Sequence, residues 1–150
     1  MRCVAGVKPE VHRAADRLED RLGAHEPPYR SRGEAQVGRV LDRYGIGFDY
    51  ERPTPVTTDY GQRFWRPDFT LPGYDDLIVE YAGMPDRPDY MAGVRYKQHV
   101  YDRNGYAALF VYPGDLTGPD WPGRLVRRLD EAAQPRYQSG NRRTPYDGRC

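Results

Sequence analysis

Two acidic residues, Asp68 and Glu80, lie in segments that otherwise alternate like β-strands. Residues 64–71 alternate apolar with polar side chains, and Asp68 falls on the polar face. Residues 77–82 form a second expected strand, in which Glu80 follows three apolar residues. A turn at 72–76 joins the two segments into a hairpin, so both carboxylates are expected on one side of a small sheet. A carboxylate after an apolar triplet is costly to bury unless it is paired or binds a metal, so the pair is a candidate cation site.

The helix expected before this hairpin carries a third acid, Glu34. Ser31 and Glu34 have the spacing of a capping box, with the serine at the N-cap and the glutamate at the third helical position. Glu34 also heads an inward stripe that continues with Val37, Gly38 and Leu41, and from there it could reach a site on the sheet. Capping and function therefore stay open as alternative roles for this glutamate.

The helix expected at 88–104 carries Lys97, one of two lysines in a chain with 21 arginines. Tyr90, Val94, Lys97 and Tyr101 share one face of this helix, which is the face expected to pack against the sheet. Two interpretations of Lys97 stay open. Its stem can cover apolar surface while the amine reaches water, or the amine can serve a site beside the carboxylates.

The remaining segments indicate a mixed α/β (α+β) fold. We expect a strand at 46–53 and a loop at 53–60, followed by the strands of Asp68 and Glu80 in an antiparallel meander. The apolar segment 106–112 follows the helix of Lys97, so a right-handed crossover should place it parallel to the Glu80 strand. Its continuous apolar run predicts a central strand that is covered on both faces. A last helix is expected at 119–132.

This arrangement resembles the PD-(D/E)XK nuclease superfamily, which has the restriction-endonuclease-like fold. Pro67-Asp68 matches the PD of the motif, and Glu80-Tyr81-Ala82 matches its acid, its spacer and its third position. The third position departs from the motif, because Ala82 stands where the family usually has lysine. Some members of the superfamily take this lysine from the following helix, which implies that the motif lysine has moved to Lys97. The resemblance covers about residues 31–116 and implies an αβββαβ core with a mixed four-stranded sheet flanked by helices.

The resemblance also implies a site that hydrolyses phosphodiester bonds with Mg²⁺, for which Mn²⁺ is expected to substitute. Hard oxygen ligands suit Mg²⁺, which keeps several waters and needs only two or three carboxylates. An amine from Lys97 would orient the attacking water and offset charge in the transition state. Arg66, on the same strand face as Asp68, would bind a phosphate bidentately. The expected metal ligands are Asp68, Glu80, the backbone carbonyl of Tyr81, and Glu34, which would bind an ion or a metal-held water.

Composition and charge indicate a soluble protein with one globular domain. Of its 150 residues, 38% are hydrophobic and 30% are charged. Residues 31–133 carry 13 basic and 16 acidic side chains, a net charge of −3 that suits cation binding. Residues 134–150 carry four arginines and one aspartate, a net charge of +3 that suits phosphate contact, although a solvated tail is the alternative. We expect an N-terminal helix at 9–23 and a linker within 1–30, a core domain at 31–133 and a flexible basic tail at 134–150.

Three functional hypotheses follow from these observations. The first is a Mg²⁺-dependent DNA endonuclease that acts as a homodimer through the 9–23 helix. The second is a module of the same fold that binds nucleic acid or a protein partner without cutting, which Ala82 supports. The third is an RNA-cutting variant of the same site. No segment is apolar enough for a membrane span or a signal peptide, and Cys3 and Cys150 lack metal-ligand spacing, so a reducing cytoplasm is expected.

Overall fold

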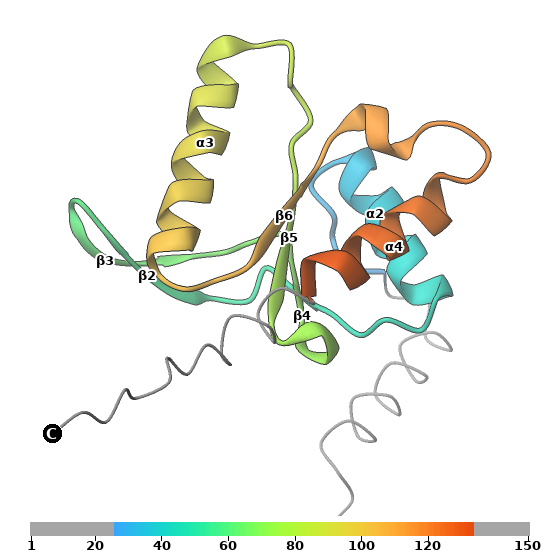
Figure 1. Ribbon diagram of the computed structural model, residues 1–150, viewed down its shortest axis with the longest axis horizontal. Helices are drawn as coiled ribbons and strands as arrows, with labels where there is room; N and C mark the ends of the chain where they lie inside the picture. Colours follow the sequence, from blue (N-terminus) through green and yellow to red (C-terminus); the bar gives the residue numbers. More distant parts are fainter. Residues whose placement is uncertain (1–25, 134–150) are drawn as a thin grey trace, which may run out of the picture.

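The computed structural model describes residues 26–133, which form three α-helices, six strands and two short 3₁₀ turns (Figure 1). The helix expected at 9–23 and the tail at 134–150 lie outside the described residues. No helix within 26–133 is long and apolar enough to cross a membrane. In chain order the elements are α2 (Arg32–Arg43), β1 (Asp49–Tyr50), β2 (Thr54–Thr58), β3 (Gly61–Trp65), β4 (Phe69–Leu71), η1 (Pro72–Tyr74), β5 (Leu77–Tyr81), α3 (Pro88–Arg103), β6 (Ala108–Val111), η2 (Pro113–Leu116) and α4 (Trp121–Ala133).

Four strands form the main sheet in the order β1-β4-β5-β6. β1, β4 and β5 pair antiparallel, and β5 pairs parallel with β6 through the crossover helix α3. α3 lies on one side of the sheet, and α2 and α4 lie together on the other (Figure 1). The expected mixed α+β fold with a four-stranded mixed sheet is therefore confirmed, as are the hairpin of the two acids and the parallel final strand.

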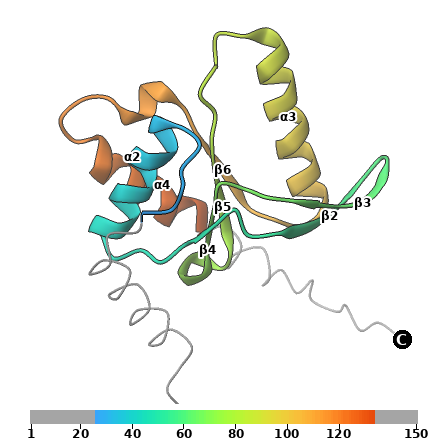
Figure 2. The same cartoon turned by 180° about the vertical axis from the view of Figure 1, so that it is seen from behind.

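The predicted loop at 53–60 is wrong, because most of it is strand β2. β2 pairs antiparallel with β3 as a separate two-stranded hairpin, from Thr54↔Trp65 to Thr58↔Gly61. Alternate β2 residues are buried, and Gly61, with a φ of +100°, allows the tight turn between the strands. Both views show this hairpin extending past the lower end of α3 (Figures 1 and 2).

The expected continuous strand at 64–71 is consequently divided into two. Trp65 pairs within the small hairpin, whereas Phe69 pairs with Val79 in the main sheet. Pro67 lies between them and has no N–H to donate to a strand ladder. The strand expected at 46–53 is also shorter than predicted, since only β1 pairs with β4 and Glu51 has a positive φ of 50°.

Alternate residues of β5 enter two separate core clusters, one on each face of the sheet. Leu77 and Val79 pack with α2 and α4, whereas Ile78 packs with α3 and β2. β6 is at the edge of the sheet within the described residues, so its predicted central position is wrong. Its apolar run has another cause, because Phe110 packs in the α3 cluster and Val111 in the α2–α4 cluster.

α2 approaches the sheet closely because it carries glycine where it meets aromatic rings. A Cβ on Gly33 would lie 2.0 Å from Cζ of Tyr81, and one on Gly38 would lie 2.1 Å from the hydroxyl of Tyr29. Any larger residue at either position would push the helix away from its neighbour. Gly33 thus lets the first turn of α2, with Glu34, lie against the end of β5, and Gly38 makes room for the Tyr29 ring.

Candidate active site

Asp68 and Glu80 lie opposite each other at the end of the β4–β5 pair. The register pairs Phe69 with Val79, so one further step places Asp68 opposite Glu80. β4 ends there, and the Asp68 carboxylate takes the place of a backbone acceptor: its Oδ2 accepts a hydrogen bond from the Tyr81 N–H at 2.7 Å. In an extended strand the N–H and C=O of one residue point to the same edge, so the Tyr81 carbonyl faces the same side.

Glu80 is 4% exposed, and partners from α3 satisfy both of its oxygens. The Lys97 ammonium lies 3.2 Å from Oε1 and 3.3 Å from Oε2. The Tyr101 hydroxyl donates to Oε1 at 2.5 Å. Lys97 and Tyr101 are one helical turn apart on the face predicted to pack against the sheet, and that prediction is confirmed. α3 thus carries an amine to the acid whose own strand has Ala82 at the third motif position.

The acids interact electrostatically, and Asp68 shows the effect most strongly. Burial and the negative charge of Glu80 raise the pKa of Asp68 from 3.8 to about 7. The Tyr81 N–H lowers this pKa, Glu34 raises it, and Lys97 lowers it. The other three residues predicted as catalytic therefore each lie close enough to Asp68 to affect its charge.

Glu34 lies in the first turn of α2, where Ser31 caps the helix but the glutamate carboxylate has other partners. Ser31 caps α2, since its Oγ accepts a hydrogen bond from the Glu34 N–H at 3.1 Å. The Glu34 carboxylate does not complete a capping box on Ser31. Its Oε2 instead accepts hydrogen bonds from the Tyr50 hydroxyl at 2.7 Å and from the Arg30 N–H at 3.1 Å. The side chain is buried, at 8% exposure, and its charge contributes to the raised pKa of Asp68.

Two tyrosine hydroxyls donate hydrogen bonds to the two glutamates of the site. Sequence reasoning assigned neither tyrosine a site role. Tyr101 is fully buried, and its ring packs edge-on against Trp65 at 5.4 Å. Burial and Glu80 raise the pKa of Tyr101, so its hydroxyl stays a proton donor. Tyr101 stands four residues after Lys97 on the same stripe, which could have identified it. Nothing local indicated Tyr50, which lies 16 residues from Glu34.

Arg66 is at the same end of the sheet but contacts none of the acids within the described residues. Its guanidinium donates to the Glu51 carbonyl at 3.3 Å, and the Glu51 N–H in turn donates to the Asp68 carbonyl at 3.2 Å. The side chain is exposed, so it is free to reorient. Its phosphate-binding role stays a prediction.

The oxygen donors of this site match the chemistry of Mg²⁺, although residues 26–133 hold no group of three or more Asp, Glu, His or Cys arranged as a metal site. Asp68 and Glu80 supply two carboxylates, and the Tyr81 carbonyl adds a neutral oxygen on the same edge. Mg²⁺ binds proteins through one or two carboxylates, with water and substrate phosphates completing its shell. The donor set therefore fits a cation that is bound together with substrate.

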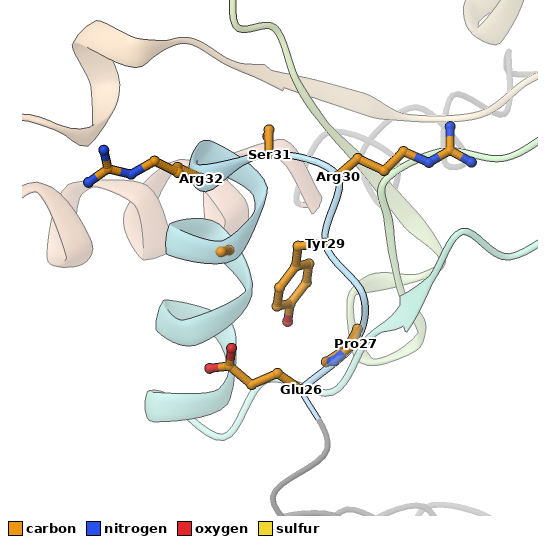
Figure 3. Close-up of a pocket in the computed structure, with 7 residues that line it drawn as sticks. Glu26, Pro27, Tyr29, Arg30, Ser31 and Arg32 are labelled. Carbon is orange, nitrogen blue, oxygen red and sulfur yellow. The ribbon is translucent and has the colours of Figure 1, made fainter.

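A hollow of about 430 Å³ lies at the start of α2 (Figure 3). The Tyr29 ring lies between α2 and the segment that precedes it, and Arg30 and Arg32 extend away on opposite sides (Figure 3). The Arg30 Nε lies 2.7 Å from the Glu51 carboxylate. This hollow is therefore a surface feature beside Glu34, and it holds none of the four predicted catalytic residues.

No protein-family model matches the chain, and a search of curated proteins finds no match.

Proposed function

We propose that this chain is a Mg²⁺-dependent nuclease that hydrolyses phosphodiester bonds in DNA. The observation that carries the proposal is the contact of Glu80 with Lys97, an amine supplied by α3, directly beside Asp68. Buried like charges destabilise a fold, and their presence together in a cleft or edge is typical of functional sites. A largely buried carboxylate pair beside an amine is the arrangement that the motif resemblance implies.

Each residue has a role in this proposal. Asp68, Glu80 and the Tyr81 carbonyl would hold the metal, which supplies Lewis-acid activation of the phosphoryl group and of the attacking water when bound. Lys97 orients that water and offsets the negative charge that develops on the phosphoryl oxygens. Glu34 holds a further water through its carboxylate. Arg66 binds a neighbouring phosphate through its guanidinium.

A binding module that does not cut is the second candidate, and one observation favours it. Both Glu80 oxygens already have donors, Lys97 and Tyr101, so the same contacts would serve a purely structural ion pair. Such a pair needs no metal. The two candidates differ in what happens when the acids are removed, because a structural pair affects stability and a catalytic pair affects turnover.

The decisive experiment is cleavage of supercoiled plasmid by the purified protein with Mg²⁺ or Mn²⁺, and with EDTA as the control. Asp68→Ala and Glu80→Ala should each reduce nicking by about a thousandfold or more, since a lost metal ligand removes several kcal/mol of transition-state stabilisation. The matched control is Asp86→Ala, because Asp86 is an exposed acid in the loop after β5. It should cut at the wild-type rate.

Two outcomes would reject the nuclease proposal. Either acid variant cutting as fast as wild type would remove the site assignment. A wild-type protein that binds DNA but nicks nothing with either metal would establish the binding module instead. An RNA substrate run in parallel tests the RNA-cutting hypothesis directly.

A further inference from the structure

A hollow of about 260 Å³ adjoins the acid pair on the side of β6, away from Asp68. Glu80 and Lys97 form part of its wall, so it opens directly from the candidate active site. The rest of its lining is mostly aromatic or apolar and comes from the end of β5, the first half of α3 and β6. This lining includes Tyr81, Tyr90, Gly93, Val94 and Phe110.

Gly93 keeps this hollow open. Glycine is among the least favourable residues inside a helix, and position 93 is in the interior of α3. Packing does not require a glycine there, because a Cβ at this position would meet nothing within 4 Å. This distinguishes Gly93 from Gly33 and Gly38, where a Cβ would strike a neighbouring ring. A side chain at position 93 would extend into the hollow.

The aromatic wall is held in place before any ligand binds. The Tyr90 hydroxyl accepts a hydrogen bond from the Gly83 N–H at 3.1 Å, which ties the first turn of α3 to the end of β5. Phe110 is 7% exposed and packed in the α3 core cluster. Asp89, at the rim, is paired with Arg87 at 3.1 Å. The hollow therefore presents fixed rings and apolar surface, with its nearby charges already partnered.

We propose that this hollow receives one unstacked nucleobase of a DNA strand whose adjacent phosphate lies at Asp68 and Glu80. This inference rests on the proposed nuclease function and names its substrate class. Unstacked bases bind in proteins against aromatic and apolar side chains, which is what the walls offer. Sites for whole small molecules have volumes of about 300–1,000 Å³, so this smaller hollow suits one part of a larger ligand. Its continuity with Glu80 and Lys97 places that part next to the reacting phosphate.

A preference for single-stranded DNA follows. A base within a duplex is paired and stacked, and it must leave the helix before it can enter a side pocket. Single strands, flaps and frayed ends meet this requirement at little cost. Because stacking depends on the π-face that every base has, the hollow should tolerate all four bases.

Binding of fluorescent oligonucleotides to the full chain, measured by anisotropy in EDTA, tests the inference without cleavage. Wild type should bind a single strand more tightly than the duplex of the same sequence. Gly93→Leu fills the hollow and should weaken single-strand binding about tenfold or more, as expected for the loss of one stacked base. Gly93→Ala, which adds one methyl group, and Ala92→Leu, on the exposed neighbouring position, should stay within about twofold of wild type. Leucine and alanine favour helix more than glycine does, so these variants should fold.

A second measurement needs no variant. One abasic site is moved along the shortest single strand that still binds, so that the strand has one register, and wild-type affinity should fall about tenfold at one position and little elsewhere. Equal affinity of Gly93→Leu and wild type, or an abasic scan that is flat within about twofold, would overturn the inference. Both measurements are made without metal, so they are independent of plasmid nicking. Active protein with a flat scan rejects the pocket alone, whereas inactive protein with a position-specific scan rejects only the nuclease function.

Discussion

At the residue scale, the charged form of the Asp68 carboxylate, at the start of β4, opposes folding. Its pKa is raised to about 7 in the folded protein, compared with 3.8 ordinarily. Between these pH values the unfolded chain has lost the proton and the folded protein keeps it. The free energy of unfolding should therefore fall as pH rises from about 4 to 7 and level off above 7.

Asp68→Asn removes this charge and keeps an acceptor for the Tyr81 N–H. Because one pKa unit corresponds to about 1.4 kcal/mol, the variant should gain on the order of 2–4 kcal/mol over wild type at pH 8. Near pH 4 the two should be equally stable. Urea denaturation in EDTA across this pH range measures the difference in stability between variant and wild type. For the control Asp86→Asn, at an exposed site, this difference should not change with pH. A variant no more stable than wild type at pH 8 would contradict this account.

Lys97 has a role that can be separated from simple charge pairing. Lys97→Met should lose most cleavage activity with little change in DNA binding, because a neutral side chain can neither orient water nor offset transition-state charge. Lys97→Arg should recover only part, since guanidinium is planar, bulkier and essentially never gives up its proton. Plasmid nicking and anisotropy measure the two properties separately.

Stability provides the control for the Lys97 prediction. Lys97→Met leaves the buried Glu80 carboxylate without its cation, and this alone should destabilise the fold. The double variant Glu80→Gln with Lys97→Met restores a neutral pair and should regain stability without regaining activity. Full activity of folded Lys97→Met would show that the lysine is only a structural partner of Glu80. The alternative rescue, Ala82→Lys with Lys97→Met, should restore measurable cutting, but Ala82 is 2% exposed, so the new side chain must displace core packing.

At the element scale, the end of α3 holds the β2–β3 hairpin against the rest of the molecule. Asn104, the C-cap of α3, accepts a hydrogen bond from the Thr57 N–H at 2.8 Å and donates to the Thr57 carbonyl at 3.0 Å. Its side-chain amide thus pairs with β2 as a neighbouring strand would. The Tyr106 hydroxyl adds a hydrogen bond to the Pro55 carbonyl at 2.7 Å.

Asn104→Ala should lower the free energy of unfolding by about 1–2 kcal/mol, because it removes these hydrogen bonds and the one to the Val100 carbonyl. The control is Arg103→Ala, which breaks only an exposed ion pair with Asp59 and should cost about 0.5 kcal/mol or less. Urea denaturation gives both values. Equal effects of the two variants would mean that the asparagine does not hold the hairpin.

At the scale of the whole molecule, the chain separates an acidic core from a basic end. Residues 31–133 have a net charge of −3, and residues 134–150 have a net charge of +3. Truncation before Gln134 should weaken DNA binding and reduce its salt dependence, by about 0.9 in the log–log slope for each phosphate that the tail neutralises in the full chain. Anisotropy at several salt concentrations gives this slope. An unchanged affinity and slope would exclude the tail from binding. The homodimer through residues 9–23 stays a prediction, to be checked by sedimentation.

The sequence by itself determined the local parts of this protein. Alternation at 77–82 predicted which β5 residues enter each core cluster, and Ser31 predicted the start of α2. The four-residue spacing from Lys97 to Tyr101 predicted one buried face of α3. These features depend on contacts within one strand or a few helical turns, where side-chain period and capping chemistry decide the outcome.

Tertiary structure alone decided the features that join distant segments. Phe69 pairs with β5 while Trp65 pairs with β2, and no local pattern separates these two partners. β6 is apolar because helices cover both of its faces. A central strand covered on both faces would have the same composition, so composition could not distinguish the two positions. The hydroxyl of Tyr50 reaches Glu34 only because β1 pairs with β4 beneath α2. The hollow beside Gly93 exists only where α3 crosses the end of β5, since its volume is set by how the two elements are packed and not by either one alone.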